Sequence, residues 1–138
     1  MLEYDVQLES ASADETRATI EDAVVVVDTS DAGRRDAPNA AELLLTALAT
    51  CMSKSVRRAA KMNHLEVGRV EVHVHGVRQD TPPKLSEVRY EVRVETDEPD
   101  QRLELLHRNV RKFGTVTNTL APGTDLDGTL VRLVREPG

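Results

Sequence analysis

The sequence predicts a single α+β domain, because short strands come first, a long apolar helix follows, and a long hairpin and a second helix come after it. Elements that are grouped along the chain, rather than alternating as strand–helix units, are typical of this class. A chain of 138 residues has the length of one domain, and no repeat or linker divides it. We therefore treat residues 1–138 as one domain.

Short strands are expected before residue 30. Residues 4–8 alternate between apolar and polar side chains, which predicts a half-buried strand. A polar turn over 10–15 leads to a second strand over 16–20. Residues 22–27 are apolar and β-branched on both sides, which favours a strand covered on both faces. A loop over 29–37 should follow.

A long buried helix is expected between Asn39 and Asn63. Asn39 can cap it, and Glu42, three residues later, completes a capping box. Residues 43–52 are apolar on nearly all sides, which marks a buried helix. One sheet of a small domain does not cover such a helix completely. A second copy of the chain is therefore expected to complete the cover, and we predict a homodimer.

A long hairpin comes next. Valines alternate with charged residues over 70–74 and 88–94, and a proline-rich loop over 80–84 separates the two runs. The solvent-facing charges have opposite signs on the two runs, which favours cross-strand pairing.

A second helix should open at residues 98–100 and end at Gly114. A short helical turn over 115–120 and a last strand over 126–134 complete the prediction. The apolar stripe of the second helix consists of Leu103, Leu106, Val110 and Phe113.

Charge and composition exclude several classes of function. The 18 basic and 24 acidic residues give a net charge of −6, which disfavours contact with nucleic acid or an anionic membrane. The longest apolar run is far shorter than a membrane span, which needs about 20 residues. A single free cysteine without a disulfide framework favours the reducing cytoplasm. No cofactor motif is present.

Cys51, the only cysteine, lies inside the most apolar stretch of the chain. It is either a small buried packing residue or a reactive nucleophile. Burial alone disfavours the reactive thiolate, so a nearby cation would have to stabilise it. Lys54 shares the helix face of Cys51 at a spacing of three residues. Arg17, Arg34 and Arg35 are the other candidates.

Two further polar motifs have ordinary structural explanations. The capping box accounts for Glu42 completely. His73 and His75 form a His-x-His pair, but no third ligand is evident, so a solvated strand face is the better interpretation. No metal site is predicted.

Residues 38–52, Pro-Asn-Ala-Ala-Glu-Leu-Leu-Leu-Thr-Ala-Leu-Ala-Thr-Cys-Met, resemble the cysteine helix of the OsmC/Ohr family of hydroperoxide-reducing proteins. That helix approximates Asn-Pro-Glu-Glu-Leu-Leu, small apolar residues, then Ala-x-Cys. Residues 112–120, Lys-Phe-Gly-Thr-Val-Thr-Asn-Thr-Leu, resemble the family's second motif, which typically reads Cys-Pro-Val-Ser-Asn-Thr-Leu. The hairpin between the motifs matches in type and order, so the resemblance spans nearly the whole chain.

The resemblance implies an OsmC-like intertwined dimer, in which long central helices are wrapped by antiparallel sheets and active sites lie at the subunit interface. It also implies a peroxidase of the oxidative stress response. In that chemistry a thiolate attacks the peroxide and becomes a sulfenic acid, a second cysteine forms a disulfide with it, and an external dithiol reduces the disulfide.

The match is incomplete at single residues. Cys51 takes the position of the attacking cysteine, whereas Gly114 stands where the second cysteine is expected. The family's active-site carboxylate falls on Ala41, with Glu42 beside it. Arg17 on the second strand is the candidate for the partner arginine. We therefore predict Cys51, Arg17 and Glu42 as catalytic candidates.

Lys54, by its helix spacing, and Phe113, Thr117 and Asn118, by the second motif, are predicted binding residues. Two functions stay open. The protein is either a one-cysteine hydroperoxide reductase that uses an external thiol, or a non-catalytic member that binds a small apolar ligand at the dimer interface with Cys51 as a packing residue.

Overall fold

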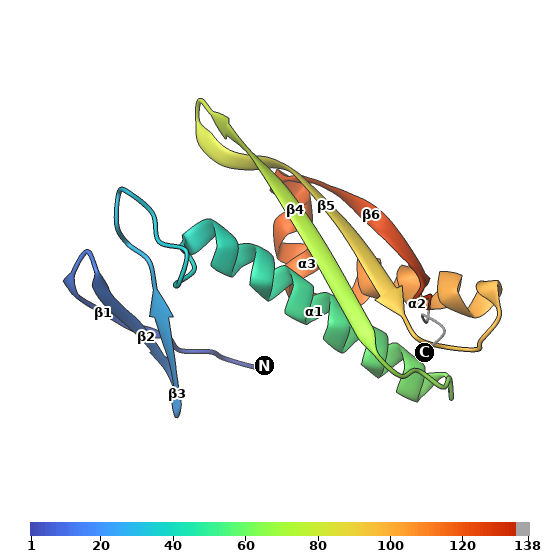
Figure 1. Ribbon diagram of the computed structural model, residues 1–138. Coiled ribbons are helices and arrows are strands. Elements are labelled where there is room, and N and C mark those ends of the chain that lie inside the picture. Colours follow the sequence, from blue (N-terminus) through green and yellow to red (C-terminus); the bar gives the residue numbers. More distant parts are fainter. Residues whose placement is uncertain (135–138) are drawn as a thin grey trace. The chain divides into compact units, whose positions relative to one another are not determined.

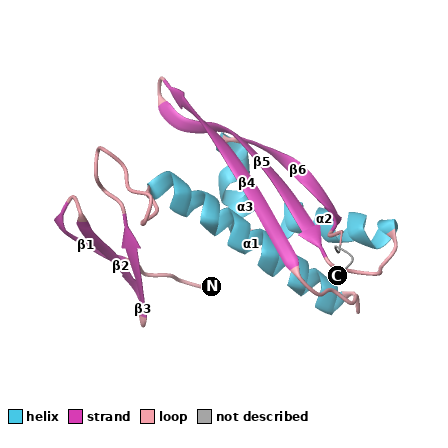
Figure 2. Cartoon of the chain, in the orientation of Figure 1, coloured by secondary structure: helices cyan, strands magenta, loops and turns pink. Residues whose placement is uncertain are grey.

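The computed structural model describes residues 1–134. The chain divides into two compact units, Met1–Leu44 and the remainder from Leu45 onward. Each unit contains one three-stranded sheet, and helices accompany the sheet of the second unit (Figures 1 and 2). The long helix and the two sheets confirm the α+β class.

The first unit is an antiparallel meander. It consists of β1 (Gln7–Ser12), β2 (Glu15–Ile20) and β3 (Ala23–Val27), paired in that order. The first strand begins and ends later than predicted, and the expected polar turn over 10–15 shrinks to two residues. The cause lies in Thr16, whose hydroxyl contacts the Ser10 hydroxyl at 2.9 Å and donates to the Ser12 carbonyl at 3.2 Å. These bonds keep a polar segment in the strand.

The third strand lacks the cover predicted for both of its faces. Val27 is buried, but Val24 is 61% exposed and Val26 is 45% exposed. Every residue of β1 is exposed as well. A run of β-branched residues therefore predicted the strand correctly, while the expectation of cover on both faces is wrong for the single chain.

The long helix α1 (Ala40–Met62) begins as the capping box predicts. The main-chain N–H of Glu42 donates to Asn39 Oδ1 at 2.9 Å, and the main-chain N–H of Asn39 donates to Glu42 Oε1 at 3.0 Å. Leu48 and Met52 are fully buried further along. Leu44 is 40% exposed, so the single chain does not bury the first turns of the helix on all sides.

The second sheet has the order β4-β5-β6. The hairpin strands β4 (Val70–Asp80) and β5 (Pro83–Val94) are antiparallel, and Glu71 and Arg93 face each other across them and form an ion pair at 3.4 Å. The cross-strand pairing of opposite charges is thereby confirmed.

The last strand, β6 (Asp125–Arg132), pairs with β5 in parallel. The sheet is therefore mixed, and the prediction of purely antiparallel sheets is wrong for this strand. The reason is the connection, because parallel neighbours need a crossover of a dozen or more residues. Two helices and one 3₁₀ turn supply it: α2 (Asp100–Phe113), α3 (Thr115–Leu120) and η1 (Ala121–Gly123).

The core of the second unit lies between α1, β5 and α2. Its larger buried side chains are Leu48, Met52, Val56, Val88, Tyr90, Val92, Val94, Leu103, Leu106 and Val110. The predicted stripe of α2 is confirmed at Leu103, Leu106 and Val110. Phe113, its last member, is 54% exposed, because the chain leaves the helix at Gly114 immediately after it.

Candidate functional site

The thiol of Cys51 lies directly against Gly114. A β-carbon placed on Gly114 would stand 2.9 Å from Cys51 Sγ, closer than real β-carbons approach other atoms. The backbone of Gly114 is ordinary, with φ −76°, so only the neighbouring atoms restrict a side chain there. Glycine therefore allows the half-buried sulfur to pack against the main chain between α2 and α3. Gly114, the position at which the resemblance implies a second cysteine, thus faces Cys51.

The corner that carries Gly114 is held by Asn118. Its amide Nδ2 donates to the Lys112 carbonyl at 3.0 Å, and its main-chain N–H donates to the Gly114 carbonyl at 2.9 Å. Both sides of Gly114 are thus tied to one residue of α3. The side chain of Asn118 has a structural function in this arrangement, and its predicted part in binding stays a prediction.

Thr117 adds a polar atom to the same place. The side chain is only 4% exposed, and its Oγ1 lies 2.8 Å from the position of the absent Gly114 β-carbon. Oγ1 has no hydrogen-bond partner among the described residues. A sulfur atom and an unpaired hydroxyl therefore both lie within 3 Å of one point beside Gly114.

A small hollow lies between α1 and α2 in the second unit. Its volume is about 90 Å³, and Arg58, Met62 and Phe113 contribute to its wall together with Ser55, Ala59 and Asn109. Ser55, Arg58 and Met62 follow Cys51 by four, seven and eleven residues, so they share its face of the helix. Sequence reasoning missed them, although this spacing was the signal that could have found them.

Lys54 is the predicted cation that belongs to the second unit. No hydrogen bond among its described residues reaches Cys51 Sγ, and the exposed Lys54 makes no ion pair there. Lys112 instead lies over the Phe113 ring, with Nζ 5.3 Å from the ring centroid. The parts predicted for Lys54 and Phe113 stay predictions.

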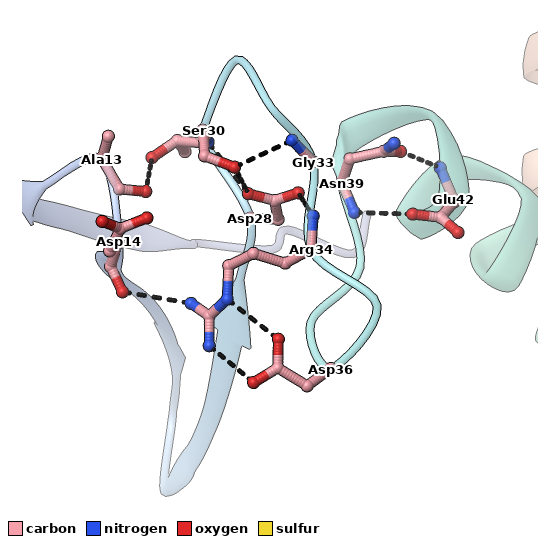
Figure 3. A network of polar contacts seen from close by, with 10 residues as sticks. Ala13, Asp14, Asp28, Ser30, Gly33, Arg34, Asp36, Asn39 and Glu42 are labelled. Carbon is pink, nitrogen blue, oxygen red and sulfur yellow. Dashed lines mark hydrogen bonds and ion pairs between the residues drawn. The ribbon is translucent and has the colours of Figure 1, made fainter.

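A polar network organises the loop of the first unit, between β3 and α1 (Figure 3). Asp28 is buried and accepts hydrogen bonds from the Ser30 hydroxyl at 2.6 Å, the Ser30 amide and the Arg34 amide. The Ser30 hydroxyl bond is the main reason why the pKa of Asp28 is lowered. Arg34 in turn donates to both carboxylate oxygens of Asp36 at 2.9 Å and to the Asp14 carbonyl. The hydrogen bonds to Asp36 are the main reason why the pKa of Arg34 is raised.

The remaining catalytic candidates also belong to the first unit. Arg17 is an exposed residue of β2, paired with Glu9 on one side and Val26 on the other. Glu42 lines an open hollow of about 500 Å³ together with Arg34 and Arg35. Cys51 belongs to the second unit. The catalytic parts of Arg17 and Glu42 therefore remain predictions.

A second polar cluster lies in the second unit, between β5, α2 and β6. Tyr90 Oη and His107 Nε2 are 2.8 Å apart, and Arg111 pairs with Asp127 at 2.7 Å. Burial raises the pKa of Tyr90 and lowers the pKa of His107. Hydrogen bonding to Arg111 lowers the pKa of Asp127. The sequence offered no sign of this cluster, because its residues lie on three separate elements, and the parallel pairing of β6 brings Asp127 to Arg111.

The site thus consists of a half-buried thiol on the long helix α1 that faces Gly114, at the start of the short helix α3, in an α+β chain. The sequence model described as "OsmC-like protein" matches residues 32–127. Because this match covers more than half of the chain, the chain belongs to the OsmC-like family. The family resemblance predicted from the two motifs is confirmed.

Solved structures of low sequence identity share the fold. An OsmC-like protein from Mycoplasma pneumoniae superposes with a TM-score of 0.86 at 15% identity, over 96% of this chain and 99% of that one. The organic hydroperoxide resistance protein OhrB of Bacillus subtilis gives 0.68 at 17% identity, over 94% and 98%. An OsmC-like protein of unknown function from Vibrio cholerae gives 0.80 at 14% identity, over 94% and 99%.

No curated protein sequence matches the chain significantly. Over residues 1–134, none of the helices has both the length and the apolar character that crossing a membrane requires.

Proposed function

We propose that the protein reduces organic hydroperoxides through Cys51, with an external low-molecular-weight thiol as the resolving agent. The observation that carries this proposal is the contact between the half-buried Cys51 sulfur and Gly114. A glycine there leaves the thiol without an intrachain partner, since Cys51 is the only cysteine of the chain. Relatives of the same fold include organic hydroperoxide resistance proteins, which supports the substrate class.

The reaction balances with two thiols for each peroxide. The Cys51 thiolate attacks the outer oxygen of R–O–O–H, the O–O bond breaks, and the leaving alkoxide takes up a proton to give the alcohol. Cys51 becomes a sulfenic acid, which condenses with an external thiol and releases water. A second external thiol attacks the mixed disulfide, so Cys51 returns to the thiol and the reductant leaves as its own disulfide.

The predicted catalytic and binding residues take complementary parts in this proposal. Arg17 supplies positive charge that favours the thiolate, and Glu42 orients the arginine, while Lys54 is the alternative cation. Phe113 provides apolar surface for the organic part of the peroxide. An opposite charge within about 4–6 Å favours the ionised form of a thiol, which is why a cation belongs in the mechanism.

A homodimer is part of the same proposal. The apolar side chains Leu8, Val24 and Val26 of the first unit are about half exposed or more, although they belong to a three-stranded sheet of a small unit. A second copy of the chain would remove this apolar surface from water. We propose an intertwined dimer that acts in the cytoplasm as part of an oxidative stress response.

The alternative of a non-catalytic apolar ligand site receives less support. The hollow beside the Cys51 face of α1 has a volume of about 90 Å³. Typical small-molecule sites occupy about 300–1,000 Å³. Dimer formation would have to enlarge this hollow severalfold before it could hold a ligand.

The test measures consumption of cumene hydroperoxide with and without added thiol, for the wild type and Cys51→Ser. We expect turnover that requires both Cys51 and the thiol. Mass spectrometry should show Cys51 as a dimedone-trapped sulfenic acid or a mixed disulfide. Activity that survives in Cys51→Ser, or a wild type whose Cys51 is not oxidised, contradicts the proposal.

A further inference from the structure

The Thr117 hydroxyl is an unusual atom in this fold. A buried hydroxyl without a hydrogen bond is unfavourable, and native structures rarely keep one without a reason. Among the described residues only one other buried side-chain atom, Arg93 Nε, lacks a hydrogen bond, and it still faces Glu91 at 3.5 Å. The hydroxyl of Thr117 is neutral, so it has no comparable ion-pair neighbour. Its unpaired donor therefore calls for a partner that residues 1–134 of the single chain do not supply.

The nearest chemistry is the thiol of Cys51. Thr117 Oγ1 and Cys51 Sγ lie 2.8 Å and 2.9 Å from the same point, the position of a β-carbon on Gly114. The two atoms are nevertheless not hydrogen-bonded to each other. An oxygen atom bonded to the sulfur would extend the reach of Cys51 by one covalent bond, and it would be a much better acceptor than a neutral thiol sulfur.

We propose that the Thr117 hydroxyl donates a hydrogen bond to the oxygen atom that Cys51 carries after oxidation. The inference rests on the proposed function, since a hydroperoxide supplies this oxygen. The hydrogen bond stabilises the sulfenic acid and withdraws electron density from it. The sulfur of the sulfenate then attacks the outer oxygen of a second hydroperoxide more slowly, so the O–O bond breaks less often and less of the sulfinic acid, Cys51–SO₂H, and its by-product alcohol are formed.

Such protection matters more in this chain than in a two-cysteine protein. A second cysteine would capture the sulfenic acid within the same molecule, whereas Cys51 must wait for an external thiol. Sulfinic acid is generally not reversible, so each escape to that state would inactivate one site. Asn118 fixes the corner through its bonds to Lys112 and Gly114, and this keeps Thr117 beside the sulfur.

The test compares wild type, Thr117→Val, Thr117→Ser and Thr119→Val. Thr117→Val removes the hydroxyl and keeps the shape, while Thr117→Ser restores the hydroxyl. Thr119 is the matched control, because it is exposed on the same helix and its hydroxyl donates to the Thr115 carbonyl. Each protein is oxidised without thiol, in separate series with cumene hydroperoxide and with hydrogen peroxide. Mass spectrometry then measures the ratio of sulfinic acid to dimedone-trapped sulfenic acid.

We expect this ratio to rise at least threefold in Thr117→Val and to remain near the wild-type value in Thr117→Ser and Thr119→Val. The melting temperature of reduced Thr117→Val should be equal to or above that of the wild type, because the variant loses an unpaired buried hydroxyl. If Thr117 were merely structural, Thr117→Val would leave the ratio unchanged and would lower the melting temperature.

Several outcomes overturn the inference. One is an unchanged ratio in Thr117→Val, and another is a Thr117→Ser variant that behaves like Thr117→Val. A clear loss of melting temperature in reduced Thr117→Val also overturns it, since the hydroxyl would then have a partner before oxidation. If only hydrogen peroxide oxidises Cys51, the proposed function fails while the hydrogen peroxide series still decides on Thr117. If neither peroxide oxidises Cys51, both proposals fail.

Discussion

The two units of the chain differ most in how they bury apolar side chains. The second unit has a continuous core, in which Leu48, Met52 and Leu106 are fully buried. The first unit has only three buried apolar residues among those described, Ala18, Val27 and Ala37. It is organised instead by the polar network around Asp28 and Arg34. The second unit therefore has a well-packed core, whereas the first unit has apolar surface left to cover.

This difference separates two questions about the protein. Gly114 and Thr117, which lie near the Cys51 thiol, belong to the well-packed unit. Single substitutions in that unit can therefore test their geometry. Arg17 and Glu42 lie in the unit with uncovered apolar surface. Predictions about them depend on assembly, whereas the packing of the thiol against Gly114 lies within one unit.

The largest expected effect comes from Leu48→Asp in the core of the second unit. Leu48 is fully buried, and an unpaired buried charge costs several kcal/mol, a large part of the stability of a small domain. We expect no cooperative thermal unfolding of this variant by circular dichroism. Leu44→Asp, one helical turn earlier and partly exposed, should remain folded. If Leu48→Asp and Leu44→Asp were equally unfolded, the proposed difference in burial between the two units would be contradicted.

Gly114→Ala and Gly114→Cys sharpen the description of the thiol. The alanine β-carbon would lie within 3 Å of Cys51 Sγ and Thr117 Oγ1, so this variant should lose about 1–3 kcal/mol by overpacking. In a disulfide with an S–S bond of about 2.04 Å, the β-carbon of one cysteine lies about 3 Å from the other sulfur. Gly114→Cys should therefore form an intrachain disulfide with Cys51 after peroxide treatment. Two free thiols under those conditions would show that Gly114 does not lie against the Cys51 sulfur.

Val24→Asp addresses the uncovered sheet of the first unit. The wild type should sediment at about twice the chain mass of 15.3 kDa at low micromolar concentration. A charge on this exposed apolar position should weaken the dimer at least about tenfold, or about 1.4 kcal/mol. Gln101→Asp adds the same charge at an exposed position of the second unit and should leave the mass unchanged. A folded wild-type monomer would end the dimer proposal.

The smallest effect concerns pH and the Tyr90–His107 pair. Burial, and secondarily the Arg111 charge, lowers the pKa of His107 from its ordinary value of 6.5, whereas Asp127 opposes the shift. Below pH 6.5 the unfolded chain therefore binds more protons than the folded chain at this site, and stability falls as pH falls towards the lowered pKa. The melting temperature of His107→Gln should decline less than that of the wild type between about pH 7 and 5.5. His73→Gln, at an exposed histidine, should follow the wild type; identical pH profiles for all three would refute the assignment.

Local patterns predicted most elements of the fold because their causes are local. The capping box of Asn39 and Glu42, the valine alternation of the hairpin and the stripe of α2 each involve residues a few positions apart. The parallel pairing of β6 has a different cause. It depends on how α2 and α3 return the chain, and no local pattern in residues 126–134 records that direction.

The site was predictable in part for the same reason. The family motifs placed Gly114 opposite Cys51, and the structure brings these two residues together. The same periodicity overestimated the burial of Phe113, because a helical stripe does not indicate where packing ends. The unpaired hydroxyl of Thr117 could not be predicted, since it depends on which neighbours are absent rather than on which residues are near in sequence.

The close approach of Gly114 to the sulfur has a consequence for the genetics of this chain. Glycine codons that end in a pyrimidine differ from cysteine codons by one base. A β-carbon on residue 114 would lie 2.9 Å from Cys51 Sγ. That single base change would therefore allow an internal disulfide, and turnover would no longer depend on small thiols. Selection could therefore move a lineage between the two modes of turnover in one mutational step, with the fold left in place.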